Sequence, residues 1–359
     1  MEKKDILLRV EHLSKYFGGR KNEFRAVDDV SFYIERGEVF GLVGESGCGK
    51  TTVGRTVIGL YPPTSGEIYL DGELIAAGTR SYLEKIKSAK EKCRQELAGA
   101  TTNEERTHLK AEFERILREN RTAIKEAEQR ARKSGDITSR IQMIFQDPSA
   151  SLDPRMTVRE IIAEGLVIRG GCRKEEIERR VLEMLELVGL LPEHASRYPH
   201  EFSGGQRQRI GIARAVIMSP ELIIADEPVS ALDVSVQAQV INLLDDLRRR
   251  FGMAVLFVAH DLSVVKYFSD RIGVMYFGKI VECAPSDELF KNPLHPYTRS
   301  LLSAIPLPDP IYERGRKRII YEGAADSDSS EPPLMREVRE GHFVMCTESE
   351  FEKYREGVR

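Results

Sequence analysis

The sequence has no tryptophan, only five cysteines and no long apolar run. The cysteines are scattered without a C-x-x-C pair, which argues against a disulfide framework and against a structural zinc site. The longest uncharged apolar runs, such as Ala254–His260, are far shorter than the roughly 20 residues of a bilayer-spanning helix. The N-terminus becomes charged before an apolar stretch develops, so no secretory signal is predicted and a reducing cytoplasm is the expected location.

The chain also lacks an excess of charge of either sign. Its 359 residues include 54 Lys and Arg against 57 Asp and Glu, a net charge of −3, and 41% of the residues are hydrophobic. This composition is typical of a folded chain long enough for about two domains. A nearly neutral chain has no overall attraction to nucleic acid or anionic lipid, so its function has to be sought in local motifs.

Two patterns of secondary structure follow one another along the chain. Residues 6–77 alternate apolar and polar positions over short segments, which predicts a β-rich part. Later, continuous apolar runs at Leu222–Ala225 and Ala254–Ala259 are flanked by helical patterns, as is typical of buried parallel strands. We therefore expect an α/β fold with its ligands at the carboxyl ends of the parallel strands.

An unusual charged segment interrupts the β-rich part at residues 80–133. It holds 15 Lys and Arg and 10 Asp and Glu, with no proline and one glycine. Its apolar positions recur every three or four residues, which predicts a narrow helical seam. Gly99 and the capping pair Thr102 and Glu105 divide it into an antiparallel helical hairpin with arms of roughly 25 and 40 Å. A solvated insertion without a role is an equally plain interpretation.

Residues 44–51 match the pattern G-x-x-x-x-G-K-[ST] between an expected strand at Glu38–Val43 and an expected helix from Lys50 to about Leu60. Glycines in such a loop let successive backbone N–H groups converge on phosphate oxygens, and the helix N-terminus adds its positive end. The lysine reaches the β- and γ-phosphates and Thr51 binds Mg²⁺. The residues expected to hold nucleotide here are Gly44, Ser46, Gly47, Gly49, Lys50, Thr51 and Thr52.

Two carboxylates follow the apolar run Leu222–Ala225. A nucleotide hydrolase needs one acidic group for the metal and one for the attacking water, and a strand end presents both side by side. We therefore expect Asp226 to hold Mg²⁺ and Glu227 to act as the general base.

Further motifs give the chain a family resemblance. Phe202-Ser203-Gly204-Gly205-Gln206 resembles the signature of the ATP-binding-cassette family, with Phe where Leu is common, and Ser230-Ala231-Leu232-Asp233 resembles its D-loop. Gln146 and His260 lie where that family has its Q-loop and its switch histidine. These motifs span residues from about 16 to 265 in the family's order, so the resemblance does not depend on one match.

The resemblance implies an ABC-type P-loop NTPase core with an antiparallel β subdomain and a helical signature subdomain at about 148–211. Two such cassettes meet head to tail, so that each closes over ATP bound to its partner. The residues expected to do so are Ser203, Gly204, Gly205, Gln206 and Asp233. It also implies that Gln146 contributes to the metal site and that His260 hydrogen-bonds the γ-phosphate. An aromatic side chain near the N-terminus is expected to stack on adenine; Phe17 is the first choice and Tyr16 the second.

The C-terminal part carries a narrower resemblance. Residues 292–302, with His295-Pro296-Tyr297 at their centre, resemble a segment of the ATPase subunits of oligopeptide and dipeptide importers, closest to the F-type subunit. This divides the chain into a nucleotide-binding domain at 1–280 and an extension at 281–359, in which His295 is read as structural. The family implies a paralogous ATPase partner, two transmembrane permeases and, indirectly, an external solute-binding protein, with the chain peripheral on the cytoplasmic face of the membrane and in contact with neither solute nor nucleic acid.

Two departures from that family stand out. Some members hold an iron–sulfur cluster with C-terminal cysteines, but only Cys346 lies beyond residue 283 here and one thiolate cannot hold a cluster, so none is expected. The hairpin at 80–133 replaces a short connection and adds about 40 residues; a permease, the partner ATPase or a regulator is its hypothetical contact.

Other functions remain open from the sequence. The transported solute of relatives includes oligosaccharides and nickel. Soluble cassette ATPases that act on DNA or ribosomes share these motifs, although the absence of a basic excess and the His-Pro-Tyr segment speak against them. A kinase with the same phosphate loop leaves the Ser-Gly-Gly motif unexplained.

Overall fold

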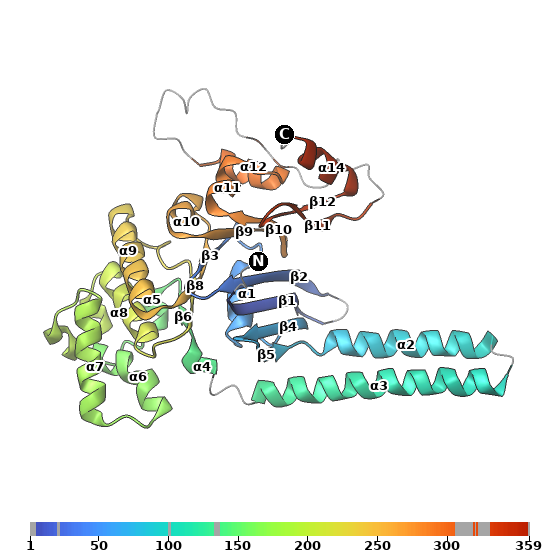
Figure 1. The fold of residues 1–359 in the computed structure, drawn as a ribbon. Helices are drawn as coiled ribbons and strands as arrows, with labels where there is room; N and C mark the ends of the chain where they lie inside the picture. Colours follow the sequence, from blue (N-terminus) through green and yellow to red (C-terminus); the bar gives the residue numbers. More distant parts are fainter. Residues whose placement is uncertain are drawn as a thin grey trace.

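The computed structural model describes residues 5–19, 22–99, 102–132, 137–305, 319, 321 and 331–357. A four-stranded antiparallel sheet, ordered β2-β1-β4-β5, packs beside a larger sheet (Figure 1). Its strands are longer at the start of the chain than the sequence pattern predicts, because β1 and β2 pair along their whole length through several register shifts. They are β1 Ile6–Phe17, β2 Phe24–Glu35, β4 Ser65–Leu70 and β5 Glu73–Ala77.

The larger sheet has eight strands in the order β11-β12-β10-β9-β3-β8-β7-β6. Strands β6 to β9 and β3 run parallel, and β10 to β12 continue the sheet antiparallel. The central strands β3, β7 and β8 are buried on both faces, as their continuous apolar runs predict. Their bounds are β3 Val39–Val43, β6 Ile141–Ile144, β7 Leu222–Asp226, β8 Ala254–Ala259, β9 Arg271–Tyr276, β10 Lys279–Pro285, β11 Leu334–Arg339 and β12 His342–Cys346.

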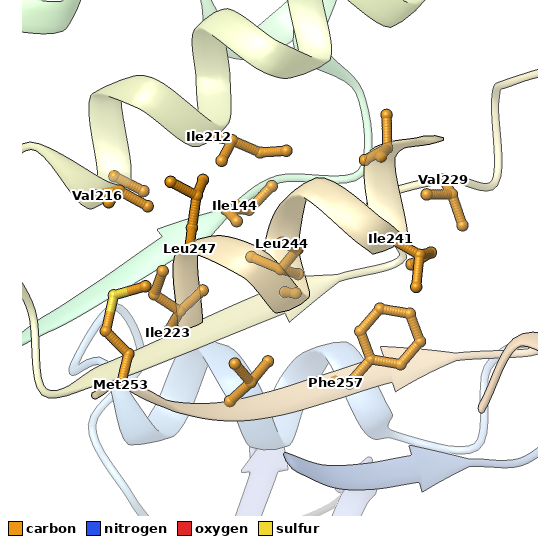
Figure 2. Close-up of a cluster of buried hydrophobic side chains, with 14 of the residues drawn as sticks. Ile144, Ile212, Val216, Ile223, Val229, Ile241, Leu244, Leu247, Met253 and Phe257 are labelled. Carbon is orange, nitrogen blue, oxygen red and sulfur yellow. The ribbon is translucent and has the colours of Figure 1, made fainter. Parts of the chain in front are cut away.

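Helices cover the parallel strands. In Figure 2, Ile241, Leu244 and Leu247 of α9 lie between side chains of the sheet and those of α8. This apolar layer fixes the positions of the loops that follow the strands, so the expected α/β core is confirmed. The helices between β6 and β10 are α5 Pro148–Ser151, α6 Val158–Arg169, α7 Lys174–Leu187, α8 Gly204–Val216, α9 Val234–Phe251 and α10 Leu262–Phe268.

The expected helical hairpin is present and projects away from the cassette (Figure 1). It consists of α2 Arg80–Gly99 and α3 Asn103–Arg132. Thr102 and Glu105 form the expected reciprocal cap, each backbone N–H donating to the other side chain at 3.3 Å. The apolar positions that recur every three or four residues are not exposed; they are Tyr82, Ile86, Ala89, Cys93 and Leu97 of α2 and Leu109, Phe113, Ile116, Ile124 and Ala127 of α3.

The C-terminal part joins the core sheet instead of standing apart from it. Strand β10 begins at Lys279 and crosses the expected boundary at 280, and β12 pairs with it. Buried Glu282 of β10 accepts the backbone N–H groups of Leu294 and His295 at 2.8 and 3.0 Å, and the Nε2–H of His342 at 2.8 Å. The helices of this part are α11 Ser286–Lys291, α12 Pro296–Ser303 and α14 Glu348–Glu356.

Candidate functional site: the nucleotide cradle

The glycine loop connects β3 to α1, which spans Lys50–Val57. Gly44 and Gly49 adopt φ values of 152° and 110°, which residues with a side chain rarely adopt. A Cβ atom at Gly44 would lie 2.2 Å from the carbonyl oxygen of Met275, and one at Gly49 would lie 2.1 Å from that of Ala26. Only glycine fits these two positions, so the loop conformation is set by close backbone packing as well as by its own turns.

Lys50 hydrogen-bonds to the start of the loop. Its side chain is buried, and its Nζ donates to the carbonyl oxygens of Gly44 and Glu45 at 2.8 and 2.9 Å. The N-cap residue of α1 is Gly49, which has no side chain to cap the helix, and the first turn has no acidic residue. The open N–H groups and the ammonium group therefore form a concentrated positive site for an anion.

Thr51 and Asp226 meet beside this loop. The Thr51 hydroxyl donates to Oδ1 of Asp226 at 2.8 Å, while Oδ2 of Asp226 is buried without a hydrogen-bond partner in the described part of the chain. Burial raises the pKa of Asp226, and the Thr51 hydrogen bond opposes that effect. Hard oxygen donors with one carboxylate oxygen unsatisfied fit a divalent cation such as Mg²⁺.

The neighbouring carboxylate, Glu227, is the meeting point of two other loops. Gln146 donates its Nε2–H to Oε2 of Glu227 at 3.0 Å, and Nδ1 of His260 lies 3.1 Å from the same oxygen. Glu227 has φ 46°, a left-handed conformation that is uncommon outside glycine and is found at functional sites. The structure thus brings Gln146, Glu227 and His260 together at one carboxylate oxygen.

The Ser-Gly-Gly motif begins α8. Ser203 caps this helix reciprocally with Gln206: the Ser203 N–H donates to the Gln206 side chain at 3.0 Å, and the Gln206 N–H donates to the Ser203 hydroxyl at 3.4 Å. A Cβ atom at Gly205 would lie 2.6 Å from Cγ1 of Val236 in α9, and Gly204 lies near Leu232. The signature therefore packs against the segment that contains Asp233, which precedes α9.

The two candidate adenine-stacking residues differ in their surroundings. The Tyr16 hydroxyl donates to Asp28 at 2.5 Å, and the guanidinium carbons of Arg25 and Arg80 each lie 5.2 Å from the centre of its ring. The Phe17 ring contacts Tyr61 edge to face at 5.3 Å, with Nζ of Lys15 at 5.0 Å from its centre. The hydrogen bond to Asp28 fixes the Tyr16 ring, whereas the Phe17 side chain has only ring contacts among the described residues, so Phe17 stays the first choice for stacking on a base.

A groove of about 710 Å³ opens along β6, the edge strand of the large sheet. Gln146 lines it together with side chains from α1, α5, α6 and α8. Gln146 therefore belongs both to this groove and to the Glu227 cluster.

One contact of the loop is not foreseen from the sequence. The backbone N–H of Glu45 donates to the hydroxyl of Tyr297 at 3.0 Å, so the His-Pro-Tyr segment touches the phosphate loop directly. The segment itself is visible in the sequence, but 252 positions separate the two residues and no local pattern joins them.

The phosphate loop and the pair of carboxylates at the end of β7 lie at one edge of a shared sheet, and the Ser-Gly-Gly motif begins another helix. Together these features define an ATPase of the cassette class. Solved structures support this class. CbiO1 of Clostridium perfringens, described as part of the ABC transporter complex cbiONQ, superposes with a TM-score of 0.57 at 23% identity, covering 80% of this chain and 92% of that one. MJ0796, described as a dimeric bacterial ABC transporter cassette, gives 0.56 at 25% identity over 78% of this chain and 99% of that one.

Sequence comparisons narrow the class. The family model "ABC transporter" matches residues 27–135 and 120–230, and "Oligopeptide/dipeptide transporter, C-terminal region" matches 281–327. The oligopeptide transport ATP-binding protein OppF of Bacillus subtilis is 52% identical over 97% of this chain and 98% of its own. The dipeptide transport ATP-binding protein DppF of Lactococcus lactis is 46% identical over 98% and 97%. The chain belongs to the ABC transporter family, in the group of ATP-binding subunits with the oligopeptide/dipeptide C-terminal region.

Proposed function

We propose that this chain binds ATP with Mg²⁺ and hydrolyses it to power the import of oligopeptides or dipeptides. The similarity over nearly its whole length to ATP-binding proteins of oligopeptide and dipeptide transport carries this proposal. Oligosaccharides or nickel are weaker alternatives because the relatives compared are described as peptide transporters. A mechanical ATPase on nucleic acid or ribosomes is weaker still, since residues 281–327 match the C-terminal region of oligopeptide/dipeptide transporters.

The phosphate loop would hold the nucleotide. Its open N–H groups and Lys50 would bind the β- and γ-phosphates, and Phe17 would stack on the adenine. The residues assigned to the phosphates are Gly44, Ser46, Gly47, Gly49, Lys50, Thr51 and Thr52.

Thr51 and Asp226 would hold Mg²⁺, joined by Gln146 when the nucleotide is present. The unsatisfied Oδ2 of Asp226 supports this assignment. The bound ion would neutralise charge on the phosphates.

Glu227 would accept the proton of the attacking water. Oε2 of Glu227, the atom contacted by both Gln146 and His260, is held in one orientation by these two neighbours. His260, exposed on its other side, would also hydrogen-bond the γ-phosphate and so report its presence.

A second ATPase subunit would complete each site. Ser203 and Gly204 are exposed at the start of α8. A phosphate of ATP bound to the partner subunit would meet the positive end of this helix. We assign Ser203, Gly204, Gly205, Gln206 and Asp233 to ATP bound by a paralogous partner. Hydrolysis would then separate the two chains.

The groove along β6 would receive a cytoplasmic helix of a permease. Gln146 would couple it to the loss of γ-phosphate, because the same side chain contacts Glu227. The chain would then lie at the cytoplasmic face of the membrane, with two permeases and, indirectly, an external binding protein as partners. No helix in the described residues is long and apolar enough to cross a bilayer.

Purification of the complex from native membranes, with this chain as the tagged component, tests the proposal. We expect a second ATPase, two permeases and ATP hydrolysis that rises when peptide-loaded binding protein is added, and that is lost in a matched Lys50→Ala complex. Recovery of a binding protein loaded with nickel or sugar, or of ribosomes without permeases, would contradict the peptide assignment.

A further inference from the structure

Tyr297 contacts the phosphate loop from the C-terminal part of the chain. Its side chain is 2% exposed, and its hydroxyl accepts the Glu45 N–H at 3.0 Å. Burial raises the pKa of Tyr297 to about 12, so the hydroxyl stays protonated near neutral pH. The contact therefore joins a neutral, fixed side chain to a backbone group of the loop.

The Glu45 residue that Tyr297 contacts is also tied to the functional lysine. Its carbonyl oxygen accepts Nζ of Lys50 at 2.9 Å, while the carbonyl of the preceding Gly44 accepts the same Nζ at 2.8 Å. Residues 44 and 45 thus lie between Tyr297 and Lys50. A change in their peptide orientation would move the lysine and the N–H groups that follow.

Tyr297 is itself held by several groups. Its N–H donates to Nδ1 of His295 at 3.1 Å, and the His295 N–H donates to buried Glu282. The Tyr297 ring packs against the Tyr276 ring at a centroid distance of 4.3 Å. Tyr276 directly follows Met275, whose carbonyl group packs closely against Gly44. Rigid support on both sides means that the hydroxyl cannot turn away without disturbing α12.

We propose that Tyr297 is a positioning residue for the phosphate loop: its hydroxyl holds the Glu45 N–H and thereby keeps Lys50 and the loop amides in the conformation that binds phosphate. The C-terminal part of the chain thus takes part in nucleotide binding without touching the nucleotide. This inference rests on the proposed function of the loop.

The test compares Tyr297→Phe with Tyr276→Phe in the full chain. Both variants remove one hydroxyl from the same aromatic cluster, but the Tyr276 hydroxyl has no hydrogen-bond partner among the described residues. For Tyr297→Phe we expect faster hydrogen exchange of the Glu45 amide and a Kd for MgATP raised about fivefold, the effect of losing one hydrogen bond. The kcat at saturating MgATP should change less than twofold, because Glu227 and its neighbours are untouched, and Tyr276→Phe should match the wild type in all three measurements.

Two results would overturn the inference: unchanged Glu45 exchange and MgATP affinity in Tyr297→Phe, or equal effects from Tyr276→Phe, which would indicate general packing. A Lys50→Ala variant distinguishes failure of this inference from failure of the proposed function. If Lys50→Ala binds MgATP as well as the wild type, the nucleotide site is misassigned, whereas the exchange of the Glu45 amide still decides whether Tyr297 positions the loop.

Discussion

Thr51 at the start of α1 donates a 2.8 Å hydrogen bond to Oδ1 of Asp226, which lies 175 positions later at the end of β7. The two residues meet because β3 and β7 both pair with β8, so that their carboxyl ends lie close together. The other oxygen of Asp226, Oδ2, is buried without a partner in the described residues. A carboxylate held in this way stabilises a bound cation but lowers the stability of the ligand-free fold.

Asp226→Asn is therefore expected to separate stability from activity. Burial raises the pKa of Asp226, so above its ordinary pKa the folded state carries a carboxylate whose charge is unfavourable. We expect the ligand-free variant to melt at the same or a higher temperature than the wild type at neutral pH, with the difference shrinking as the pH falls. Mg²⁺-dependent hydrolysis should drop about a hundredfold. A variant that melts lower at neutral pH, or that keeps its hydrolysis, would contradict this expectation.

Glu227→Gln tests the general base. The amide cannot accept the proton of water, so kcat should fall by about two to four orders of magnitude while MgATP affinity stays within about twofold. An ATP-bound dimer with the partner ATPase should accumulate. Asp246→Asn, at an exposed position on α9, is the matched control and should behave as the wild type. Normal turnover of the Glu227 variant would remove the assignment.

Cys48 should react slowly with alkylating reagents near neutral pH. Burial raises the pKa of the thiol, and nearby Lys50 opposes this effect only in part. Because the thiolate is the nucleophile, labelling should lag behind that of the unfolded chain at about pH 7.5 and speed up as the pH rises. Mass spectrometry of the peptide that contains Cys48 measures the rate, and MgATP should slow it further. Fast labelling at neutral pH that MgATP does not affect would be inconsistent with a buried thiol in the nucleotide loop.

His295→Asn should reduce the acid sensitivity of the fold. Burial lowers the pKa of His295, with Glu282 opposing, so the imidazole stays neutral in the folded state while it gains a proton in the unfolded chain. Stability is therefore lost as the pH falls below about 6.5. Asparagine also accepts the cap hydrogen bond that Nδ1 accepts from Tyr297, but does not titrate. Melting curves between about pH 7.5 and 5.5 should fall less steeply for this variant than for the wild type or for His200→Asn; equal slopes in all three would exclude the effect.

Removing the hairpin should leave the cassette folded. Its described contacts with the rest of the chain lie at its base, where Arg80 pairs with Glu23 and Tyr82 donates to Glu67. We expect a chain with residues 82–132 replaced by a short glycine-serine linker to keep its MgATP affinity, and to lose assembly or uptake if the hairpin contacts a permease, the partner ATPase or a regulator. Unchanged assembly, hydrolysis and uptake would leave the hairpin without a role in transport.

Local sequence was enough for much of this protein. The glycine loop, the acidic pair and the seam of the hairpin are set by neighbours in the chain, through turns that only glycine adopts and through helical periodicity. The α/β core followed from the buried apolar runs at 222–225 and 254–259. The length of β1 and β2 did not, because pairing through register shifts is a property of two strands together.

Only the tertiary structure decided which of these pieces touch. Gln146 and His260 reach one oxygen of Glu227 because three loops end at the same edge of a sheet. Tyr297 contacts Glu45 because β10 extends that sheet, and the chain after β10 brings α12 next to the phosphate loop. The sequence determined the chemistry of each group through its residue types, whereas the distances between the groups depend on how the strands pair and pack, which no short stretch of chain encodes.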